Sequence, residues 1–239
     1  MLDLSIVVGT LERPDAIRRL IDSIVANTKV SYELLIGDAS KVPLAQSSVP
    51  AAVRVLLEQP RLGFVKGYNR CFRECKGPWV VWLNDDAVVT PSWDTEAIGV
   101  MEANPHVGLG CLAYSECGGP FYVRSYADMV YANFGIMPRS FGDEIGWFNE
   151  KLVMYGVDNA ITFDVLLHNR FVVPINTSCI LHMRADDELR KVNAAGAALA
   201  SAKLTELYGA KMSTIRATYE CLRKVPLAQP KKPSATPSA

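Results

Sequence analysis

The stretch Trp79-Val-Val-Trp-Leu-Asn-Asp-Asp86 carries the strongest structural signal in this chain of 239 residues. Its first five residues are apolar and favour extended backbone, which predicts a buried strand over Trp79–Leu83. The strand runs directly into Asn84, Asp85 and Asp86. Adjacent carboxylates at the end of a buried strand are costly unless a cation or hydrogen-bond donors meet them. A divalent metal ion is the natural candidate, because it prefers oxygen ligands and also binds substrate phosphates.

Short β-prone runs alternate with amphipathic segments on both sides of this stretch. The pattern predicts further strands over 5–10, 32–37, 53–57, 107–113 and 171–181, and helices from Pro14 and over 64–76, 92–104, 157–168 and 186–223. This alternation is typical of an α/β fold with a mostly parallel central sheet flanked by helices. In such a sheet, ligands bind at the carboxyl ends of the strands.

Polar residues stand where three of the predicted strands end. Thr10 and Glu12 follow the first strand, Asp38 follows the second, and the Asn84–Asp86 run follows the Trp79–Leu83 strand. Each is an ordinary turn residue when taken alone. Three such ends at one edge of a sheet indicate a ligand site.

The same pattern suggests a division of the chain. Residues 1–114 would form a first half, and residues 115–184 a second half with a mobile loop over 115–134. A helical segment over 185–225 has an Ala-rich composition with weak amphipathic character, and we expect it to pack on the domain or to form a homodimer. The tail over 226–239 is rich in Pro, Ser, Ala and Lys, and we expect it to be disordered.

Composition excludes several classes of protein. Twenty-five basic residues balance 25 acidic ones, which argues against a nucleic-acid partner. No apolar run approaches the roughly 20 residues of a transmembrane helix, and the first residues read as a buried strand rather than a signal peptide. The six cysteines include no CxxC pair, which fits reduced thiols and a cytoplasmic location. Neither GxxxxGK[ST] nor GxGxxG occurs, so a P-loop and a dinucleotide site are excluded.

An ordered set of segments, spanning roughly residues 4 to 209, resembles family 2 glycosyltransferases of the GT-A fold. Ser5-Ile-Val-Val-Gly-Thr10 with Arg13-Pro14 is similar to the opening strand and turn of that family, with Gly9 where Pro is usual. The other segments that carry the resemblance are Glu33–Ser40, Arg61–Asn69 with Arg61 in place of Asn, Leu83–Asp86, Gly146–Glu150, Tyr155–Asn159 and Lys203–Gly209.

This resemblance implies an inverting transfer from a nucleoside-diphosphate sugar to a glycan or other hydroxyl acceptor, assisted by Mn²⁺ or Mg²⁺. Asp86 and His182 would hold the metal ion. The donor would be bound by Thr10, Glu12, Asp38, Asn69, Asn84 and Asp85. The resemblance also implies that residues 1–114 are the donor-binding half and residues 115–184 the acceptor-side half.

Asp158 is the residue that we expect to act as general base. An inverting transfer needs a carboxylate to take the proton of the acceptor hydroxyl, and a helix N-terminus favours the ionised form. The family usually has Glu-Asp here with another Asp after it, whereas this chain has Asp158-Asn159 and then Ile161. Asp143 and Glu144 are the alternative bases. Trp147 and Tyr155 would either stack on an acceptor sugar or belong to the core.

Two rival functions are compatible with these features. One is a nucleotide- or sugar-binding module of the same fold without turnover, which the irregular 157–161 segment would suit. The other is a sugar nucleotidyltransferase, which would normally carry a Gly-rich basic loop after the first strand. The sequence VVGTLERPD has no such loop.

Overall fold

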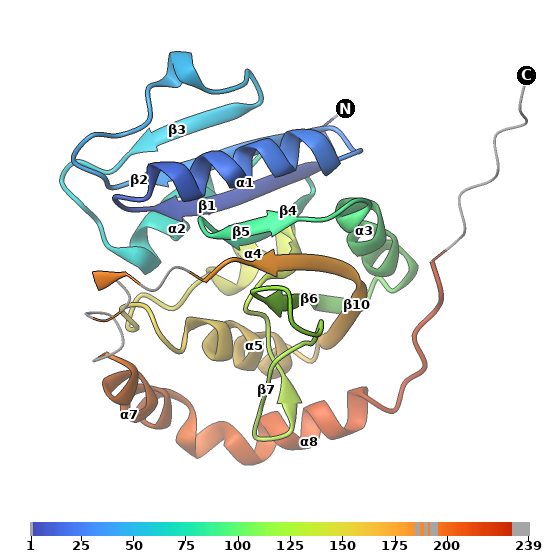
Figure 1. The fold of residues 1–239 in the computed structure, drawn as a ribbon. Helices are drawn as coiled ribbons and strands as arrows, with labels where there is room; N and C mark the ends of the chain where they lie inside the picture. The colour runs from blue at the N-terminus through green and yellow to red at the C-terminus, as the bar shows by residue number, and fades with distance from the viewer. Residues whose placement is uncertain (1, 185–186, 189–190, 192–195, 231–239) are drawn as a thin grey trace, which may run out of the picture.

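An eight-stranded sheet forms the centre of the structure, a computed structural model that describes residues 2–184, 187–188, 191 and 196–230 (Figure 1). The strand order is β3-β2-β1-β4-β9-β6-β10-β5. The strands are β1 (Leu4–Thr10), β2 (Tyr32–Asp38), β3 (Val53–Leu57), β4 (Trp79–Asn84), β5 (Ala87–Val89), β6 (Val107–Glu116), β9 (Gly135–Pro138) and β10 (Phe171–His182). The sheet is mostly parallel, as predicted; β9 and β5 run antiparallel to their neighbours.

The register of the parallel strands gathers the polar strand ends. Thr10 pairs with Asp38 across β1 and β2, and Gly9 pairs with Asn84 across β1 and β4. The carboxyl ends of β1, β2 and β4 therefore lie side by side, at the edge where an α/β sheet binds its ligand.

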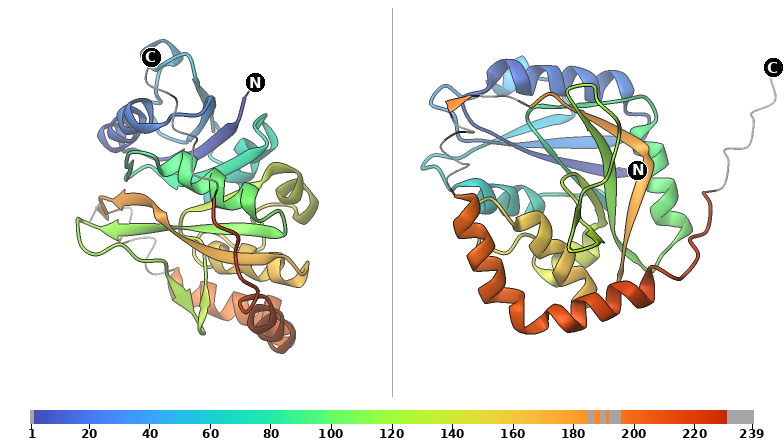
Figure 2. Two further views of the ribbon diagram at one scale, coloured as in Figure 1. Left: turned by 90° about the vertical axis from the view of Figure 1, so that its right-hand side faces the viewer. Right: turned by 60° about the horizontal axis from the view of Figure 1, so that its bottom comes forward.

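Helices cover both faces of the sheet (Figures 1 and 2). On one face, α1 (Pro14–Asn27) shares a core cluster with apolar side chains of β1, β2 and β4, and α3 (Trp93–Ala103) packs on β10 and β6. On the other face lie α2 (Phe64–Arg73), α4 (Arg139–Ile145) and α5 (Val157–Leu167). Successive side chains of a strand point to opposite faces, so each buried strand contributes to both cores. Val7 belongs to one core cluster, and Ile6 and Val8 belong to the other.

The segment over 115–134 contains more structure than its composition indicated. β6 continues to Glu116, Tyr114 forms an isolated bridge with Tyr122, and a short hairpin joins β7 (Ser125–Tyr126) to β8 (Met129–Val130). The mobility expected for this loop stays a prediction.

The C-terminal helical segment is divided in two. α7 (Ala197–Tyr208) is followed by a 3-10 turn over Gly209–Lys211 and then by α8 (Met212–Leu222), which packs against α5. Residues 226–230 have no regular secondary structure, yet Ala228 exchanges two hydrogen bonds of 2.8 and 3.1 Å with the side chain of Asn104. The rest of the expected disordered tail, 231–239, lies outside the described residues. A homodimer through α7 and α8 stays a prediction.

No helix in the described residues is both long enough and apolar enough to cross a bilayer.

Candidate active site

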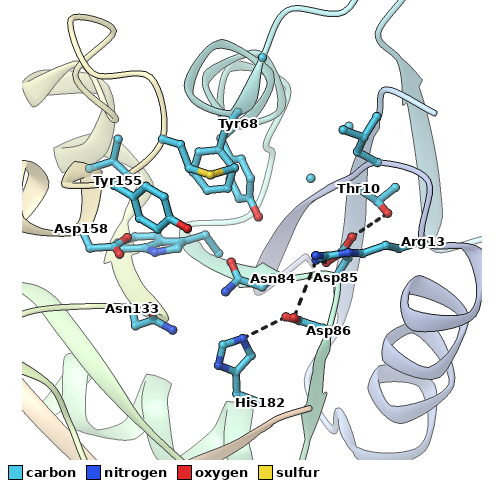
Figure 3. A pocket seen from close by; sticks show the side chains of 18 of the residues that line it. Thr10, Arg13, Tyr68, Asn84, Asp85, Asp86, Asn133, Tyr155, Asp158 and His182 are labelled. Carbon is cyan, nitrogen blue, oxygen red and sulfur yellow. Dashed lines mark hydrogen bonds and ion pairs between the residues drawn. The ribbon is translucent and has the colours of Figure 1, made fainter. Parts of the chain in front are cut away.

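A pocket of about 450 Å³ opens at the carboxyl ends of the strands (Figure 3). It lies between the turn after β1, the turn after β4, the end of β10 and the N-terminus of α5. Six of the predicted site residues line it together: Thr10, Asn84, Asp85, Asp86, Asp158 and His182.

Asp85 is buried beneath the pocket and is held by two donors. The hydroxyl of Thr10 donates to its Oδ2 at 3.0 Å, and Nη1 of Arg13 donates to its Oδ1 at 3.0 Å. Arg13 also forms two hydrogen bonds of 2.7 and 2.9 Å with Asp187. Burial nevertheless raises the pKa of Asp85 above its ordinary value, and the neighbouring Asp86 adds to the shift against the opposing effect of Arg13. Within the described residues, the guanidinium of Arg13 is shared by Asp85, Asp86 at 3.8 Å and Asp187.

Asp86 and His182 form the part of the pocket that suits a metal ion. Nε2 of His182 lies 3.1 Å from Oδ1 of Asp86, and both side chains are buried. The other ring nitrogen of His182, Nδ1, has no hydrogen-bond partner among the described residues, which is uncommon for a buried imidazole nitrogen. One carboxylate and one imidazole provide two of the ligands of a divalent ion; diphosphate oxygens and water supply the remainder at sites of this kind. The described residues contain no group of three or more His, Cys, Asp or Glu side chains arranged for a metal.

Asp158 stands in the first turn of α5, two residues after the helix cap at Gly156. No hydrogen bond within the described part of the chain reaches its carboxylate, which faces the pocket. Burial raises the pKa of Asp158 to about 7, although the nearby Arg124 guanidinium acts in the opposite direction. A carboxyl group with a pKa near neutrality is well suited to accept a proton from a substrate hydroxyl.

Three predicted donor-binding residues do not line the pocket. Asp38 is buried, and its two oxygens accept hydrogen bonds from the backbone N–H groups of Ser40 and Leu44, at 2.9 and 2.8 Å. Glu12 points to solvent and accepts a hydrogen bond from the backbone of Lys41. These two carboxylates shape the turns around the pocket. A direct contact of either one with a donor is not supported by this geometry.

Asn69 is the third of these residues. Its amide nitrogen donates to the carbonyl of Phe148 and to Glu150, and its amide oxygen accepts from the backbone of Phe148. Asn69 therefore fastens the segment after α4 onto α2. It stabilises the structure around the pocket without lining it.

The two alternative bases and one of the two aromatic candidates also lie outside the pocket lining. Asp143 accepts a hydrogen bond of 2.9 Å from the indole of Trp147, and neither Asp143 nor Glu144 lines the pocket. Trp147 is buried and stacks on Phe72, so it is a core residue. Tyr155 lines the pocket with 37% of its surface exposed, which keeps it available to a ligand.

Several pocket residues had no role assigned from the sequence. Glu58 is buried at the end of β3, and burial raises its pKa. Arg13, Arg61, Arg124, Arg184, Tyr68, Tyr131 and Asn133 also line the pocket. The Arg13-Pro14 motif offered a signal for Arg13. For Arg124 and Asn133, which lie in an irregular segment, the sequence offered none.

Comparison with known proteins identifies the family of this chain. Residues 5–166, well over half of the chain, match the family described as Glycosyl transferase family 2. The chain belongs to glycosyl transferase family 2. This match confirms the resemblance drawn from the ordered sequence segments.

Curated relatives include glycosyltransferases of several bacteria. An uncharacterized glycosyltransferase of Haemophilus influenzae is 26% identical over 108 residues, or 44% of this chain. The O-antigen biosynthesis protein RfbC of Myxococcus xanthus is 32% identical over 116 residues, or 45% of this chain. The uncharacterized glycosyltransferase YwdF of Bacillus subtilis is 27% identical over 173 residues, or 64% of this chain. The alignments cover 37%, 9% and 65% of those proteins, respectively.

Solved structures confirm the fold. TarS 1–349 of S. aureus in complex with UDP-GlcNAc superposes with a TM-score of 0.61 and 15% identity, over 78% of this chain and 60% of TarS. GalNAc-T7 with UDP, GalNAc and Mn²⁺ superposes with a TM-score of 0.62 and 13% identity, over 78% of this chain and 44% of the GalNAc-T7 chain. The fold is accordingly the GT-A type of glycosyltransferases.

Proposed function

We propose that this protein transfers a sugar from a nucleoside-diphosphate sugar to a hydroxyl group of an acceptor glycan, with inversion at the anomeric carbon. Family membership supports sugar transfer. The observation that supports the mechanism is the placement of Asp158 and the Asp86–His182 pair in one pocket. A base on one wall and a candidate metal site on another are what a single displacement requires.

Each part of the chain has a role in this proposal. Thr10, Asn84 and Asp85 lie on the β1–β4 side and would position the donor. Asp86 and His182 would hold Mn²⁺ or Mg²⁺, which when bound supplies positive charge to the departing diphosphate. TarS and GalNAc-T7 have been crystallised with uridine nucleotides, and GalNAc-T7 with Mn²⁺.

Asp158 would take the proton of the attacking hydroxyl while that oxygen bonds to the anomeric carbon. The bond from that carbon to the diphosphate oxygen breaks on the opposite face, and its electron pair leaves with the nucleoside diphosphate. One displacement of this kind inverts the anomeric configuration, and the chain's carboxylate forms no bond to the sugar.

Calorimetric titration with UDP or dTDP, with and without Mn²⁺, tests the donor site. We expect binding that strengthens at least about tenfold with Mn²⁺, because the metal ion joins the diphosphate to Asp86 and His182. Asp86→Asn and His182→Gln should each remove this metal dependence while the far-UV circular dichroism spectrum stays unchanged. Asp22→Asn, which alters an exposed carboxylate on α1, is the matched control and should bind as the parent does.

The proposal fails if both nucleotides bind equally well with and without Mn²⁺ in the parent protein. It also fails if neither nucleotide binds in either condition.

A further inference from the structure

One wall of the pocket carries more positive than negative charge. Arg124 donates to Glu116 Oε1 at 2.7 Å, and Arg184 donates to Glu116 Oε2 at 3.3 Å. Both guanidiniums line the pocket, and their side chains are 41% and 48% exposed. Burial alone would raise the pKa of Glu116, but the hydrogen bond and charge of Arg124, together with Arg184, bring it below its usual value. Glu116 is therefore fully ionised and cancels one of the two positive charges.

The Arg124 end of this wall faces the proposed base, and Arg184 stands two residues after His182. Arg124 follows β6 in the chain, and it is the group whose charge opposes the raised pKa of Asp158. Thr10 and Asp85 belong to the β1–β4 side, where Arg13 already pairs with Asp85 and Asp187. Because the group that takes a proton from the acceptor must lie beside the acceptor, the space next to Arg124 and Asp158 belongs to the acceptor.

Asn133 provides a further donor on the same wall. Its Nδ2 atom is closed to solvent and has no hydrogen-bond partner among the described residues. Figure 3 shows the side chain between Asp158 and His182, along the edge of the pocket. A buried N–H group without an acceptor is costly, so a ligand oxygen placed here would be stabilised.

From these contacts we propose that the acceptor carries an anionic group, a phosphate or a carboxylate, which Arg124 and Arg184 bind beside the reacting hydroxyl. Guanidinium groups match both anions with paired hydrogen bonds. The anion would bind Arg124 and Arg184 alongside Glu116. Its negative charge would balance the positive charge that Glu116 does not neutralise. This inference rests on the proposed function, because Asp158 locates the acceptor.

Calorimetry on the full chain loaded with UDP and Mn²⁺ tests the inference. The titrants are methyl glucoside, glucose 6-phosphate and glucuronate, together with the matching galactose compounds. We expect at least one anionic sugar to bind about tenfold tighter than its neutral counterpart. The phosphate and carboxylate arms then show which anion is preferred.

Variants separate a specific site from general attraction. Arg124→Gln should reduce the preference for the anionic sugar to less than about threefold, and Arg184→Gln should reduce it in part, while UDP affinity stays within about twofold. Arg54→Gln is the matched control: Arg54 is 35% exposed, pairs with Glu74 at 3.0 Å and lies outside the pocket lining.

Three results overturn the inference. Anionic and neutral sugars that bind equally to the parent protein would do so, as would the absence of binding by every anionic sugar. A loss of UDP affinity in Arg124→Gln without a change in sugar preference would assign Arg124 to the donor instead. If UDP itself does not bind, the proposed function fails, and the same sugars titrated into the nucleotide-free protein still measure the anion preference.

Discussion

Asp158 is the residue whose titration should control the pH dependence of transfer. Its carboxyl group must be ionised to accept a proton, and burial raises its pKa to about 7. At pH 6 only about a tenth of the free protein then has an ionised base. We expect kcat/KM to fall as the pH decreases through 7 and to level off above pH 8. Asp158→Asn should lower kcat about a hundredfold or more and leave UDP affinity unchanged. Transfer by this variant at the parental rate would show that another group is the base.

Gly9 explains one departure from the family pattern. A Cβ atom at this position would lie 2.7 Å from Cε2 of Tyr68, whose hydroxyl donates to the carbonyl of Leu83 at 2.7 Å. We expect Gly9→Ala to lower the free energy of unfolding by about 1–3 kcal/mol, because the ring cannot move without breaking this hydrogen bond. Chemical denaturation measures the change. Gly209→Ala is the control. A Cβ atom at position 209 would lie 3.6 Å from its nearest neighbour, Cγ2 of Thr205, so the free energy of unfolding of this variant should be unchanged or higher.

The residues of the site divide by what their polar atoms contact. Thr10, Asn84, Asp85, Asp86 and His182 follow directly from polar strand ends or from the family resemblance, and the parallel register brings them together. Asp38, Glu12 and Asn69 have equally suitable chemistry, but their oxygens are used by nearby backbone N–H groups. Which role such a residue takes depends on the path of the following loop. That path is not encoded in a local pattern.

At the level of elements, hydrophobic periodicity located the strands and helices that are long and regular. It did not locate β9, whose four residues lie between β4 and β6, or β5, whose three residues pair with β10. Segments this short contain at most two alternations, so the period of a strand cannot be recognised. Their pairing partners are also distant in sequence, which a local pattern does not specify.

α7 connects the C-terminal segment to the helix that carries the proposed base. The hydroxyl of Tyr208 donates to Asp164 of α5 at 2.9 Å and accepts from Asn149 at 3.1 Å. Leu204 packs over Gly156, where a Cβ atom would lie 2.9 Å from its side chain. These contacts fix the N-terminus of α5 and the carboxyl half of the same helix.

Tyr208→Phe removes both hydrogen bonds and leaves the half-buried carboxylate of Asp164 without this donor. We expect the free energy of unfolding to fall by about 1–3 kcal/mol, because the hydrogen bonds are lost. We also expect kcat to fall, because the helix that carries Asp158 is held less firmly. UDP affinity should be retained, because the donor side of the pocket is unchanged. Tyr126→Phe, on a tyrosine that is 48% exposed, is the control. A purely structural role would lower stability and leave kcat unchanged in the folded protein.

Across the whole molecule, the proposed donor and acceptor halves share one sheet. The boundary drawn after residue 114 falls inside β6, and β9 from the second half is inserted between β4 and β6 of the first. The pocket lies where the two halves meet, with Thr10 and Asp85 on one side and Arg124 and Asp158 on the other. The proposed base lies on α5, which packs against β10 and β6, and the proposed metal site lies after β4 and at the end of β10. This shared framework would keep the two at a fixed separation, which a single displacement between two substrates requires.

This shared sheet predicts that the two halves unfold together. Without β9, the edges of β4 and β6 that pair with it would have no partner, and the core around Trp82 and Ile136 would open to water. In urea we therefore expect one transition, with the same midpoint by far-UV circular dichroism and by tryptophan fluorescence. The fluorescence reports on both halves, because Trp79, Trp82 and Trp93 lie in the first half and Trp147 lies in the second. UDP with Mn²⁺ should raise that midpoint for both signals equally, because the ligand stabilises a single cooperative unit. Separate midpoints, or a shift confined to one signal, would show that the halves are independent and that the sheet does not couple them.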